Sequence, residues 1–308
     1  MVSSCKSYEC HNTIVTSAIE EFPSSSGAKN DLYWVAAQSI QIVITYIGKI
    51  SSAMDKDQTN LEHSIDTATG QDAPASISSE RVKKIFTDIA WDYEKFNTYS
   101  SFGQYRSWLR TLIDKSPITP DSRMLDIAGG TGDVTFTACK YKKPGFIILS
   151  DYTPAMLDVA QARLDAGEAC GVDVDLAVVD GQDIPYDDES FDIVTMSYGI
   201  RNMPEREKAL SEMYRVLKRG GALCVLEFST PPNPLMRLGY RIYLRWGIPA
   251  WGKICTGDAS GFVYLAKSIK AFPNQEGFSR MLKDAGFSRV KYTNVTFGVA
   301  AVHIAYKD

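Results

Sequence analysis

The stretch LDIAGGTGDVT, which begins at residue 125, is a glycine-rich segment at the end of a predicted strand. A dinucleotide-binding loop has the pattern G-x-G-x-x-G. In this chain Gly130 and Gly132 fit the first two positions, but Thr135 stands where the third glycine belongs. Asp126 and Asp133 flank the glycines, and acids near a loop repel an anion such as a pyrophosphate. The segment therefore favours a cationic or zwitterionic ligand.

Polar residues also end the three strands that are predicted after this loop. Asp151 ends FIILSD, Asp180 and Gly181 end VDLAVVDG, and Ser197 stands near the end of FDIVTMSYG. Ligands of open α/β sheets bind beyond the carboxyl ends of the strands. We therefore expect these residues and the glycine loop to lie on one rim of the sheet.

Each rim residue has a chemical interpretation and a plainer alternative. Asp151 is placed to accept both hydroxyls of a ribose, or is a surface acid. Asp180 is placed to accept the exocyclic amine of adenine, or belongs to an ordinary Asp-Gly turn. Gly129 and the two glycines after it let the backbone approach a ligand, or only make a tight turn. Ser197 would lie beside the reactive end of the ligand.

Short strands alternate with amphipathic helices around these residues, which predicts right-handed βαβ units and a parallel sheet. The expected strands are 123–129, 146–151, 174–181, 191–199 and 222–229. Three helices are expected among these strands: one that begins at residue 133, one over 153–167, and one over 205–221 that ends at a glycine. A helix over 275–287 precedes two strand-like runs, 289–298 and 299–307, which predict an antiparallel hairpin at the end of the sheet.

Composition narrows the class of protein. The 308 residues allow one large domain or two small ones, and 44% hydrophobic with 23% charged residues is ordinary for a soluble enzyme. The net charge of -4 and the lack of a Lys/Arg stripe argue against nucleic-acid binding. The six cysteines form no pattern of a metal site or disulfide framework, which favours a reduced, cytosolic setting and no bound metal.

The first 79 residues differ from the rest. They are polar and serine-rich at the start and contain no arginine before residue 80, unlike a mitochondrial transit peptide. The apolar run 32–47 is interrupted by polar residues and is shorter than the roughly 20 residues that span a bilayer. A membrane-surface helix is the alternative there. Since Met54 offers a second start, we expect residues 1–53 to be dispensable. Residues 54–80 lack apolar periodicity, which predicts a flexible segment, so residues 1–79 together are expected to be a flexible or dispensable leader. Helical periodicity begins near residue 80 and continues to Ile113, which predicts a helical cap over 80–120.

Five stretches resemble one known family. They are LDIAGGTGD, SYGIRNMPEREKAL, EMYRVLKRGGALCVLEFSTP, YLAKSIKAFPNQEGF and AGFSRVKYTNVTFGVAAVHIAYK, and the match covers roughly residues 80–308. The chain resembles class I S-adenosylmethionine-dependent methyltransferases, and within them the family that C-methylates the quinol ring in ubiquinone and menaquinone biosynthesis. The first stretch is generic to the superfamily, and the others are specific to the quinone branch.

The resemblance implies a Rossmann-like α/β fold with seven strands, the last of them antiparallel. It also implies a helical N-terminal cap and a lid insertion over 231–270. The implied cofactor is S-adenosylmethionine, and the methyl-donor positions map onto Thr131, Asp151, Asp180, Gly181 and Ser197, beside Gly129, Gly130 and Gly132.

The sequence departs from the family pattern at three places. Tyr105 precedes Arg106 where relatives have a His-Arg pair, Glu94 follows Tyr93 where they have Asp, and Asp180 stands where they often have an amide. These changes leave donor binding intact and bear mainly on the side of the site that faces the acceptor.

The implied chemistry is attack of an aromatic ring carbon on a methyl sulfonium, which requires an ionised ring hydroxyl and hence a quinol. A phenol with a pKa of about 10 needs help at neutral pH. Arg201 could favour the phenolate by its charge and Asn202 by a hydrogen bond; the alternative is that Arg201 pairs with a carboxylate. Tyr93 and His303 are further catalytic candidates, and a core histidine is the alternative for His303.

A prenylated quinol is thus the expected substrate, with demethylmenaquinol favoured and 2-methoxy-6-polyprenyl-1,4-benzoquinol as the alternative. A non-catalytic scaffold of a quinone-synthesis complex and a nicotinamide-dependent oxidoreductase are the alternatives from other classes. The aromatic and arginine-containing run 234–252 favours a membrane-surface lid, with a core-covering insertion as the alternative. We expect a cytoplasmic protein in peripheral contact with the inner face of the cell membrane, and a homodimer is left open.

Overall fold

The computed structural model describes residues 83–84, 86–87, 90–101, 103–249 and 260–308. The chain divides into two units, residues 1–67 and 68–308, and all described residues belong to the second. The expected leader over residues 1–79, including the apolar run 32–47, lies outside the described residues.

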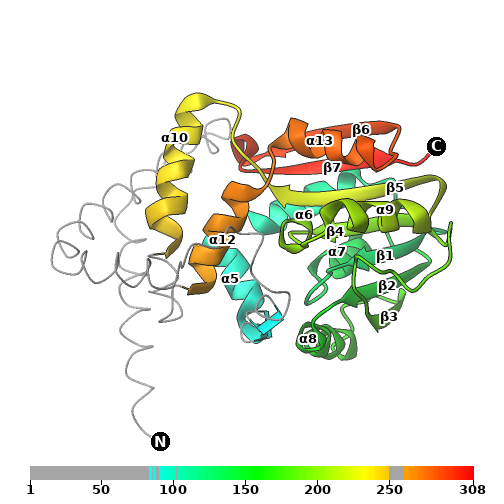
Figure 1. Ribbon diagram of the computed structural model, residues 1–308. Helices are drawn as coiled ribbons and strands as arrows, with labels where there is room; N and C mark the ends of the chain where they lie inside the picture. Colours follow the sequence, from blue (N-terminus) through cyan, green and yellow to red (C-terminus); the bar gives the residue numbers. More distant parts are fainter. Residues whose placement is uncertain (1–82, 85, 88–89, 102, 250–259) are drawn as a thin grey trace, which may run out of the picture. The chain divides into compact units, whose positions relative to one another are not determined.

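One seven-stranded sheet organises the described part of the chain, in the order β3-β2-β1-β4-β5-β7-β6 (Figure 1). Its strands are β1 (Arg123–Ile127), β2 (Phe146–Asp151), β3 (Asp173–Val178), β4 (Phe191–Ser197), β5 (Leu217–Phe228), β6 (Arg289–Val295) and β7 (Ala300–Tyr306). The pairs among β1 to β5 are parallel, and β7 is antiparallel to both β5 and β6. The predicted sheet and the hairpin at its end are confirmed, although the 3-10 turn η5 (Thr296–Gly298), and not Gly298 alone, joins β6 to β7.

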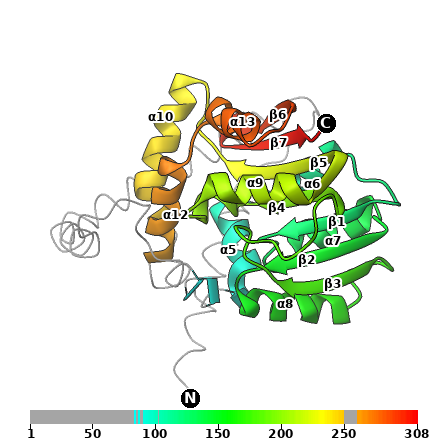
Figure 2. The ribbon, with the colours of Figure 1, turned by 45° about the vertical axis from the view of Figure 1, so that its right-hand side comes forward.

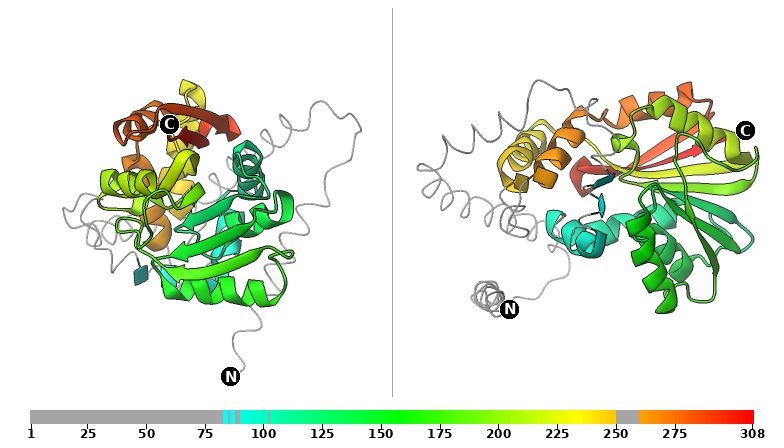
Figure 3. Two further views of the ribbon diagram at one scale, coloured as in Figure 1. Left: turned by 90° about the vertical axis from the view of Figure 1, so that its right-hand side faces the viewer. Right: turned by 60° about the horizontal axis from the view of Figure 1, so that its bottom comes forward.

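Helices cover both faces of the sheet, because both faces of its central strands are apolar. In β1, Met124 packs with α6 and α7, whereas Leu125 belongs to the core that α9 and α13 complete. Figure 3 shows α9 and α13 on one side of the sheet and α6 on the other. The helices are α6 (Tyr105–Lys115), α7 (Asp133–Tyr141), α8 (Pro154–Asp165), α9 (Arg206–Val216) and α13 (Gln275–Asp284).

The predicted helix over 205–221 is wrong at its end. Helix α9 ends at Val216, and Leu217 already begins β5. The ammonium of Lys307 donates to the carbonyl oxygens of Tyr214, Arg215 and Leu217 at 3.0, 3.3 and 2.7 Å, so it caps the last turn from the far end of the sequence. Gly220 and Gly221 then form backbone hydrogen bonds with Lys307, and they do not stop the helix.

The remaining helices lie beyond the carboxyl ends of β4 and β5 (Figure 2). They are α5 (Tyr93–Ser100), preceded by the 3-10 turn η2 (Ala90–Asp92), then α10 (Pro234–Ile242), the π-helical segment η4 (Tyr243–Gly247) and α12 (Ser260–Ala271). Leu244 and Ile248 pack against Phe262, Leu265 and Ile269, which joins η4 to α12. The hydroxyl of Tyr243 donates to the carbonyl oxygen of Ser100 at 2.9 Å, which joins η4 to α5. Of the helices in the described ranges, none is long and apolar enough to cross a membrane.

Candidate active site

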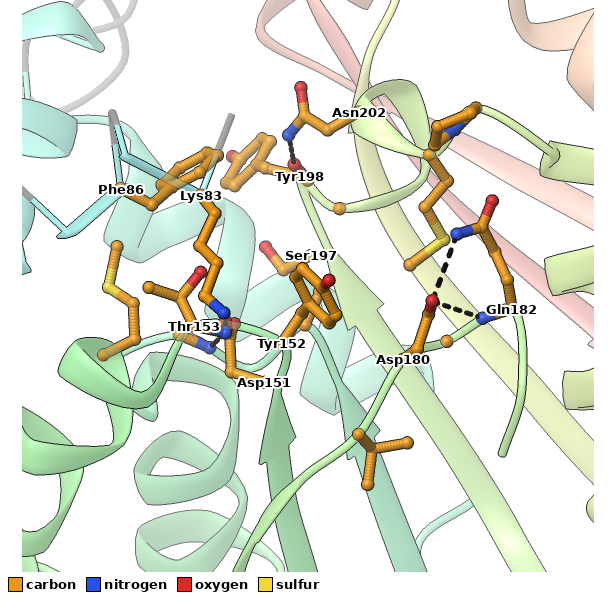
Figure 4. A pocket seen from close by; sticks show the side chains of 18 of the residues that line it. Lys83, Phe86, Asp151, Tyr152, Thr153, Asp180, Gln182, Ser197, Tyr198 and Asn202 are labelled. Atoms are coloured by element: carbon orange, nitrogen blue, oxygen red, sulfur yellow. Dashed lines mark hydrogen bonds between the residues drawn. The ribbon is translucent and has the colours of Figure 1, made fainter. Parts of the chain in front are cut away.

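A pocket lies at the carboxyl ends of β1, β2, β3 and β4, where the sequence predicted a ligand-binding rim. Its empty space, the open mouth included, is about 820 Å³. Figure 4 shows Asp151 and Asp180 on one side of it and Tyr198 with Asn202 on the other. The structure thus brings the predicted strand-end residues to one cavity, although strands β3 and β4 end earlier than expected, at Val178 and Ser197.

The glycine loop joins β1 to α7 through left-handed backbone. Gly132 has a φ of 90° and is the N-cap of α7, and a Cβ atom there would stand 2.5 Å from the ring of Phe136. The amide of Gly132 donates to the carbonyl of Gly129, and the amide of Gly130 donates to Asp151. These two amides are therefore already used within the protein and cannot cradle a phosphate group.

Asp126 of β1 holds this loop in place through its neighbours in α7 and β4. It is fully buried, and its two carboxylate oxygens accept hydrogen bonds from Thr135 at 2.8 Å and Thr195 at 2.7 Å. Burial raises the pKa of Asp126 to about 6, against the lowering effect of the two threonines. Thr135, which stands at the position of the missing third glycine, therefore fixes the carboxylate of Asp126 by a hydrogen bond.

The acids that flank the glycines do not line the pocket. Asp126 lies under the loop, and Asp133 pairs with Arg163 of α8, whose Nη1 lies 2.8 Å from its carboxylate. The same Nη1 donates to the carbonyl of Thr131 at 2.9 Å. The predicted repulsion of an anion by these two acids is therefore wrong, because both are engaged within the protein and the basic Arg163 contacts the loop. A pyrophosphate is disfavoured instead because the amides of Gly130 and Gly132 are already occupied.

Asp151 is the central acid of the pocket. It is 8% exposed, and its Oδ2 accepts the amide of Gly130 at 2.9 Å while its Oδ1 accepts the amide of Thr153 at 2.8 Å. Burial raises the pKa of Asp151, and these backbone donors oppose the rise. Each carboxylate oxygen keeps acceptor capacity, since an ionised carboxylate offers about four lone-pair positions. Asp151 can therefore accept two hydroxyls of a ligand.

Asp180 and Gln182 form the adjoining wall. The Oδ1 of Asp180 accepts the amide of Gln182 at 2.9 Å and its side-chain amide at 3.1 Å (Figure 4). Gly181 between them lies against Met203, because a Cβ atom at Gly181 would stand 2.7 Å from the Met203 methyl carbon. Asp180 thus belongs to a turn, as the plainer alternative had it, and it also lines the pocket.

The end of β4 supplies Ser197 and Tyr198. The Oγ of Ser197 and the hydroxyl of Tyr198 are buried and have no hydrogen-bond partner among the described residues. Tyr198 has a φ of 56°, and Ala128 at the end of the neighbouring β1 has a φ of 52°. Non-glycine residues in this region cost about 1–3 kcal/mol each and concentrate at functional sites.

Arg201 lies in η3 (Ile200–Asn202), directly behind this wall. Its side chain is 5% exposed, and its Nη1 donates to Oε1 of Glu227, 2% exposed, at 2.9 Å. Nη1 also donates to the carbonyl of Tyr198, whereas Nε has no partner among the described residues. Arg201 therefore pairs with a carboxylate, which was the alternative interpretation of this residue.

Aromatic side chains surround this buried ion pair. Phe228 lies 4.8 Å from the Tyr198 ring, centroid to centroid, and the Arg201 guanidinium lies 5.4 Å from the centroid of Phe228. Burial raises the pKa of Tyr93 to about 12 and that of Tyr240 further, and the Arg201 charge opposes both shifts. These tyrosines keep their protons at neutral pH.

The predicted site residues fall into three groups. Gly130, Asp151, Asp180, Gly181, Ser197, Tyr93 and Asn202 line the pocket. Gly129, Thr131, Gly132 and Arg201 lie in or beside its walls without lining it. His303 lies elsewhere, in β7 under α13: its Nε2 contacts the carbonyl of Gln275 at 3.2 Å, and its ring packs against Phe278 and Tyr292.

Sequence reasoning missed several lining residues. Tyr152, Thr153 and Met156 follow Asp151 directly, so the strand-end argument could have included them. Lys83 and Phe86 come from the N-terminal helical region, where the apolar periodicity predicted a helix but no site residue. Glu227 could have been noticed as an acid within the apolar run ALCVLEFS.

Solved structures of other proteins share this fold. The cyclase SpnF gives a TM-score of 0.54 at 16% identity, covering 78% of this chain and 99% of its own. A Haloferax volcanii methyltransferase in complex with the Trm112 activator gives a TM-score of 0.52 at 15% identity, covering 72% and 96%. At these identities the likeness concerns the Rossmann-like fold alone.

Sequence comparisons are more specific. The ubiquinone/menaquinone biosynthesis C-methyltransferase UbiE of Ectopseudomonas mendocina is 43% identical over 239 residues, 77% of this chain and 93% of the relative. The UbiE protein of Dinoroseobacter shibae is 42% identical over 226 residues, 73% and 90%. Residues 75–307 also match the model of the ubiE/COQ5 methyltransferase family. The chain therefore belongs to the ubiE/COQ5 methyltransferase family.

Proposed function

We propose that this protein transfers the methyl group of S-adenosylmethionine to a ring carbon of a prenylated quinol, and that the quinol is demethylmenaquinol. Two halves of the site take part. The donor half is the glycine loop with Asp151, Asp180 and Ser197, and the acceptor half is Tyr93, Tyr198, Arg201, Asn202, Glu227 and Tyr240.

The donor half fits S-adenosylmethionine. Asp151 would accept the ribose hydroxyls, and Asp180 or Gln182 the adenine amine, between the apolar side chains of Met156 and Met203. The unpartnered Oγ of Ser197 would face the amino-acid end. When bound, the cofactor supplies an electrophilic methyl group on a cationic sulfur. Lys83 is the one cation among the lining residues, and the glycine loop has no amide of Gly130 or Gly132 to offer, so a dinucleotide fits less well.

The acceptor half fits a phenolic ring. A ring carbon becomes nucleophilic when the neighbouring hydroxyl loses its proton, and hydrogen bonds to the anion favour that loss. Asn202 donates one amide N–H to the Tyr198 carbonyl and keeps the other, and Arg201 keeps its Nε–H. We assign both as donors to the acceptor oxygen. Because Glu227 pairs with Arg201, Arg201 acts as a directed donor more than as a bare positive charge.

Tyr93 enters the proposal as a hydrogen-bond donor. It lines the pocket, and a pKa raised to about 12 makes it a poor base at neutral pH. His303 has no part in the proposed chemistry. Burial lowers its pKa to about 4, and it contacts none of the acceptor half among the contacts above, so we propose that it supports the core.

The observation that carries the proposal is that one pocket is lined by residues of both halves, with Arg201, Glu227 and Tyr240 behind its acceptor wall. Asp151 and Ser197 line it together with Tyr93, Tyr198 and Asn202, so a donor and an aromatic acceptor would meet there. The several aromatic rings of the acceptor half support a fused bicyclic naphthoquinol over the benzoquinol alternative. The family relatives support quinone biosynthesis in general.

The test is a methylation assay with the purified full chain. Labelled S-adenosylmethionine is supplied with a prenylated demethylnaphthoquinol or 2-methoxy-6-polyprenyl-1,4-benzoquinol, each kept reduced. We expect faster transfer to the naphthoquinol and none to the oxidised quinones. Faster transfer to the benzoquinol would show that the benzoquinol, and not demethylmenaquinol, is the acceptor. Binding of the donor without any transfer would favour the scaffold alternative. A titration with NADH, expected to show no binding, tests the oxidoreductase alternative. A cytoplasmic location and a homodimer stay predictions.

A further inference from the structure

The segment formed by α10 and η4 exposes an apolar face. Leu235 is 77% exposed, Leu238 56%, Ile242 44% and Trp246 40%. Their spacing of three to four residues places them along one side of the helix. These are among the most exposed large apolar side chains of the described residues, and together with Gly239 they are called the outer face below.

The outer face is not needed for the core. The opposite side of the same segment carries Tyr240, Tyr243, Leu244 and Ile248, and this side packs against α12 and α5. The segment therefore has a filled apolar side and a second apolar side that no described residue covers. In an ordinary amphipathic surface helix, the side that is turned away from the core carries polar residues.

The charge around the outer face is positive. Arg241 and Arg245 are exposed beside the apolar residues, whereas the guanidinium of Arg237 donates to the carbonyl oxygens of Pro231 and Pro232. No acid occurs in the sequence between Glu227 and Asp258, although the whole chain carries -4. Arg245 stacks on the ring of Trp246, 5.3 Å from its centroid. Arginine beside tryptophan and aliphatic side chains is the composition of helices that lie in the interface of an anionic bilayer.

We propose that the outer face of α10 and η4 is a docking surface for an anionic lipid bilayer. A second copy of this chain fits less well, because a two-fold contact through this face would bring its arginines against each other. A bilayer supplies both missing complements at once: hydrocarbon for the leucines and isoleucine, and phosphate groups for the arginines.

The docking surface has a consequence for the acceptor, which rests on the proposed function. Tyr240, one residue after Gly239, lies within the electrostatic reach of Arg201 and Glu227. The segment would thus touch the bilayer on one side and the acceptor half on the other. Removing a prenyl tail from lipid costs about 0.8 kcal/mol for each CH₂ group, so a ring that enters the site while its tail stays in the bilayer avoids that cost.

Gly239 allows a clean test. It is exposed in the middle of the outer face, and a Cβ atom there would meet nothing within 4 Å. Gly239→Glu places a carboxylate on the face, and Gly239→Ala is the matched control. Both replace glycine in a helix by a better helix former, so neither is expected to unfold the protein.

The experiment is sedimentation of the full-length protein with vesicles of phosphatidylglycerol and phosphatidylcholine in equal parts, or of phosphatidylcholine alone. We expect binding to the mixed vesicles, unchanged binding for Gly239→Ala, and binding at least about tenfold weaker for Gly239→Glu, since a charge near lipid opposes insertion. Arg241→Gln is expected to bind about fivefold more weakly, the factor that corresponds to about 1 kcal/mol for each arginine near an anionic surface.

Equal binding of Gly239→Glu and Gly239→Ala would overturn the proposal, as would binding that ignores lipid charge. A dimer of the parent that Gly239→Glu dissociates in sedimentation velocity would overturn it in favour of a contact between copies. Vesicle binding needs neither methyl donor nor acceptor, so it stands or falls apart from the proposed reaction. Turnover of a short-chain, water-soluble quinol should be equal in both variants, whereas turnover of a prenylated quinol in vesicles should fall for Gly239→Glu.

Discussion

The two acids of the donor half are held mainly by backbone amides, whereas the acceptor half is held by side chains from separate elements. Asp151 is fixed by two amides, and Asp180 by the amide of Gln182. Arg201, in contrast, is fixed by Glu227 of β5 and surrounded by rings from α5, β4 and α10. An acid held by backbone amides depends mainly on the course of the chain, while a group held by side chains depends on each partner residue.

This difference teaches where variation can be tolerated. The donor half keeps its geometry as long as β1, β2 and the loop fold. The acceptor half leaves Tyr198, Tyr240 and Arg201 with polar atoms that have no partner among the described residues. A ligand that supplied those partners would stabilise this half most.

The largest expected effect is on folding. Arg201→Met leaves Glu227 buried without its partner, and breaking a buried pair in this way costs about 3–5 kcal/mol. The double variant Arg201→Met/Glu227→Leu removes both charges and should recover most of that loss. Urea unfolding of the two variants measures the difference. A single variant as stable as the parent would mean that side chains do not hold the acceptor half.

The next effect is on turnover. The double variant Arg201→Met/Glu227→Leu folds by the preceding argument, and it lacks the proposed donor to the acceptor oxygen. We expect turnover with reduced acceptor to fall about 10²–10³-fold, as when an oxyanion-stabilising donor is removed. Affinity for S-adenosylmethionine should stay the same. Glu227→Gln retains Arg201 and should lose less; turnover equal to the parent in the double variant contradicts the role of Arg201.

A smaller effect is expected in the donor half. Asp151→Ala removes the acceptor of the ribose hydroxyls, and S-adenosylmethionine binding should weaken by about 1.5–3 kcal/mol, the cost of hydrogen bonds to a charged group. Calorimetry on the folded variant measures it. Ser197→Ala, which removes a neutral hydroxyl, should cost about 1 kcal/mol or less. Unchanged affinity in Asp151→Ala would remove Asp151 from the donor half.

The smallest effect at neutral pH concerns His303. Its folded pKa of about 4 lies below the ordinary 6.5, so the unfolded chain binds a proton first as the pH falls. The stability that a neutral His303 contributes is present above about pH 6.5 and is lost as the pH falls toward 4, at up to about 1.4 kcal/mol for each pH unit. His303→Gln should lack this dependence and keep most turnover at pH 7.5. A large loss of turnover there would restore His303 as a catalytic residue.

The rim of the sheet could be predicted because parallel strands bring their carboxyl ends together whatever the side chains are. Asp151, Asp180 and Ser197 therefore came from strand periodicity alone. The end of α9 could not be predicted, because Lys307, which caps it, lies at the other end of the sequence. The partner of Arg201 was also out of reach, since β4 and β5 become neighbours only in the folded sheet.

The identity of the flanking acids shows a further limit. Sequence places Asp126 and Asp133 beside the glycines, but side-chain direction decides what they meet. Asp126 turns inward to two threonines, and Asp133 meets an arginine from α8. Successive side chains of a strand point to opposite faces of the sheet, so the position of Asp126 in the sequence does not by itself give the groups that its carboxylate meets.

The π-helical turn at Tyr243–Gly247 makes the length of this segment as important as its composition. Such turns arise when one extra residue is accommodated inside an α-helix. The extra residue is absorbed within the turn, so the α-helical residues before and after it keep the facing that uninterrupted α-helical pitch would give them. Loss of a single residue at the turn would therefore restore α-helical pitch while Leu235 and Leu238 still face outward and Ile248 still faces α12. In regular α-helix the same deletion would rotate one flank by about 100°, so we expect natural variants of this segment to differ in length by one residue at this turn and not elsewhere in α10.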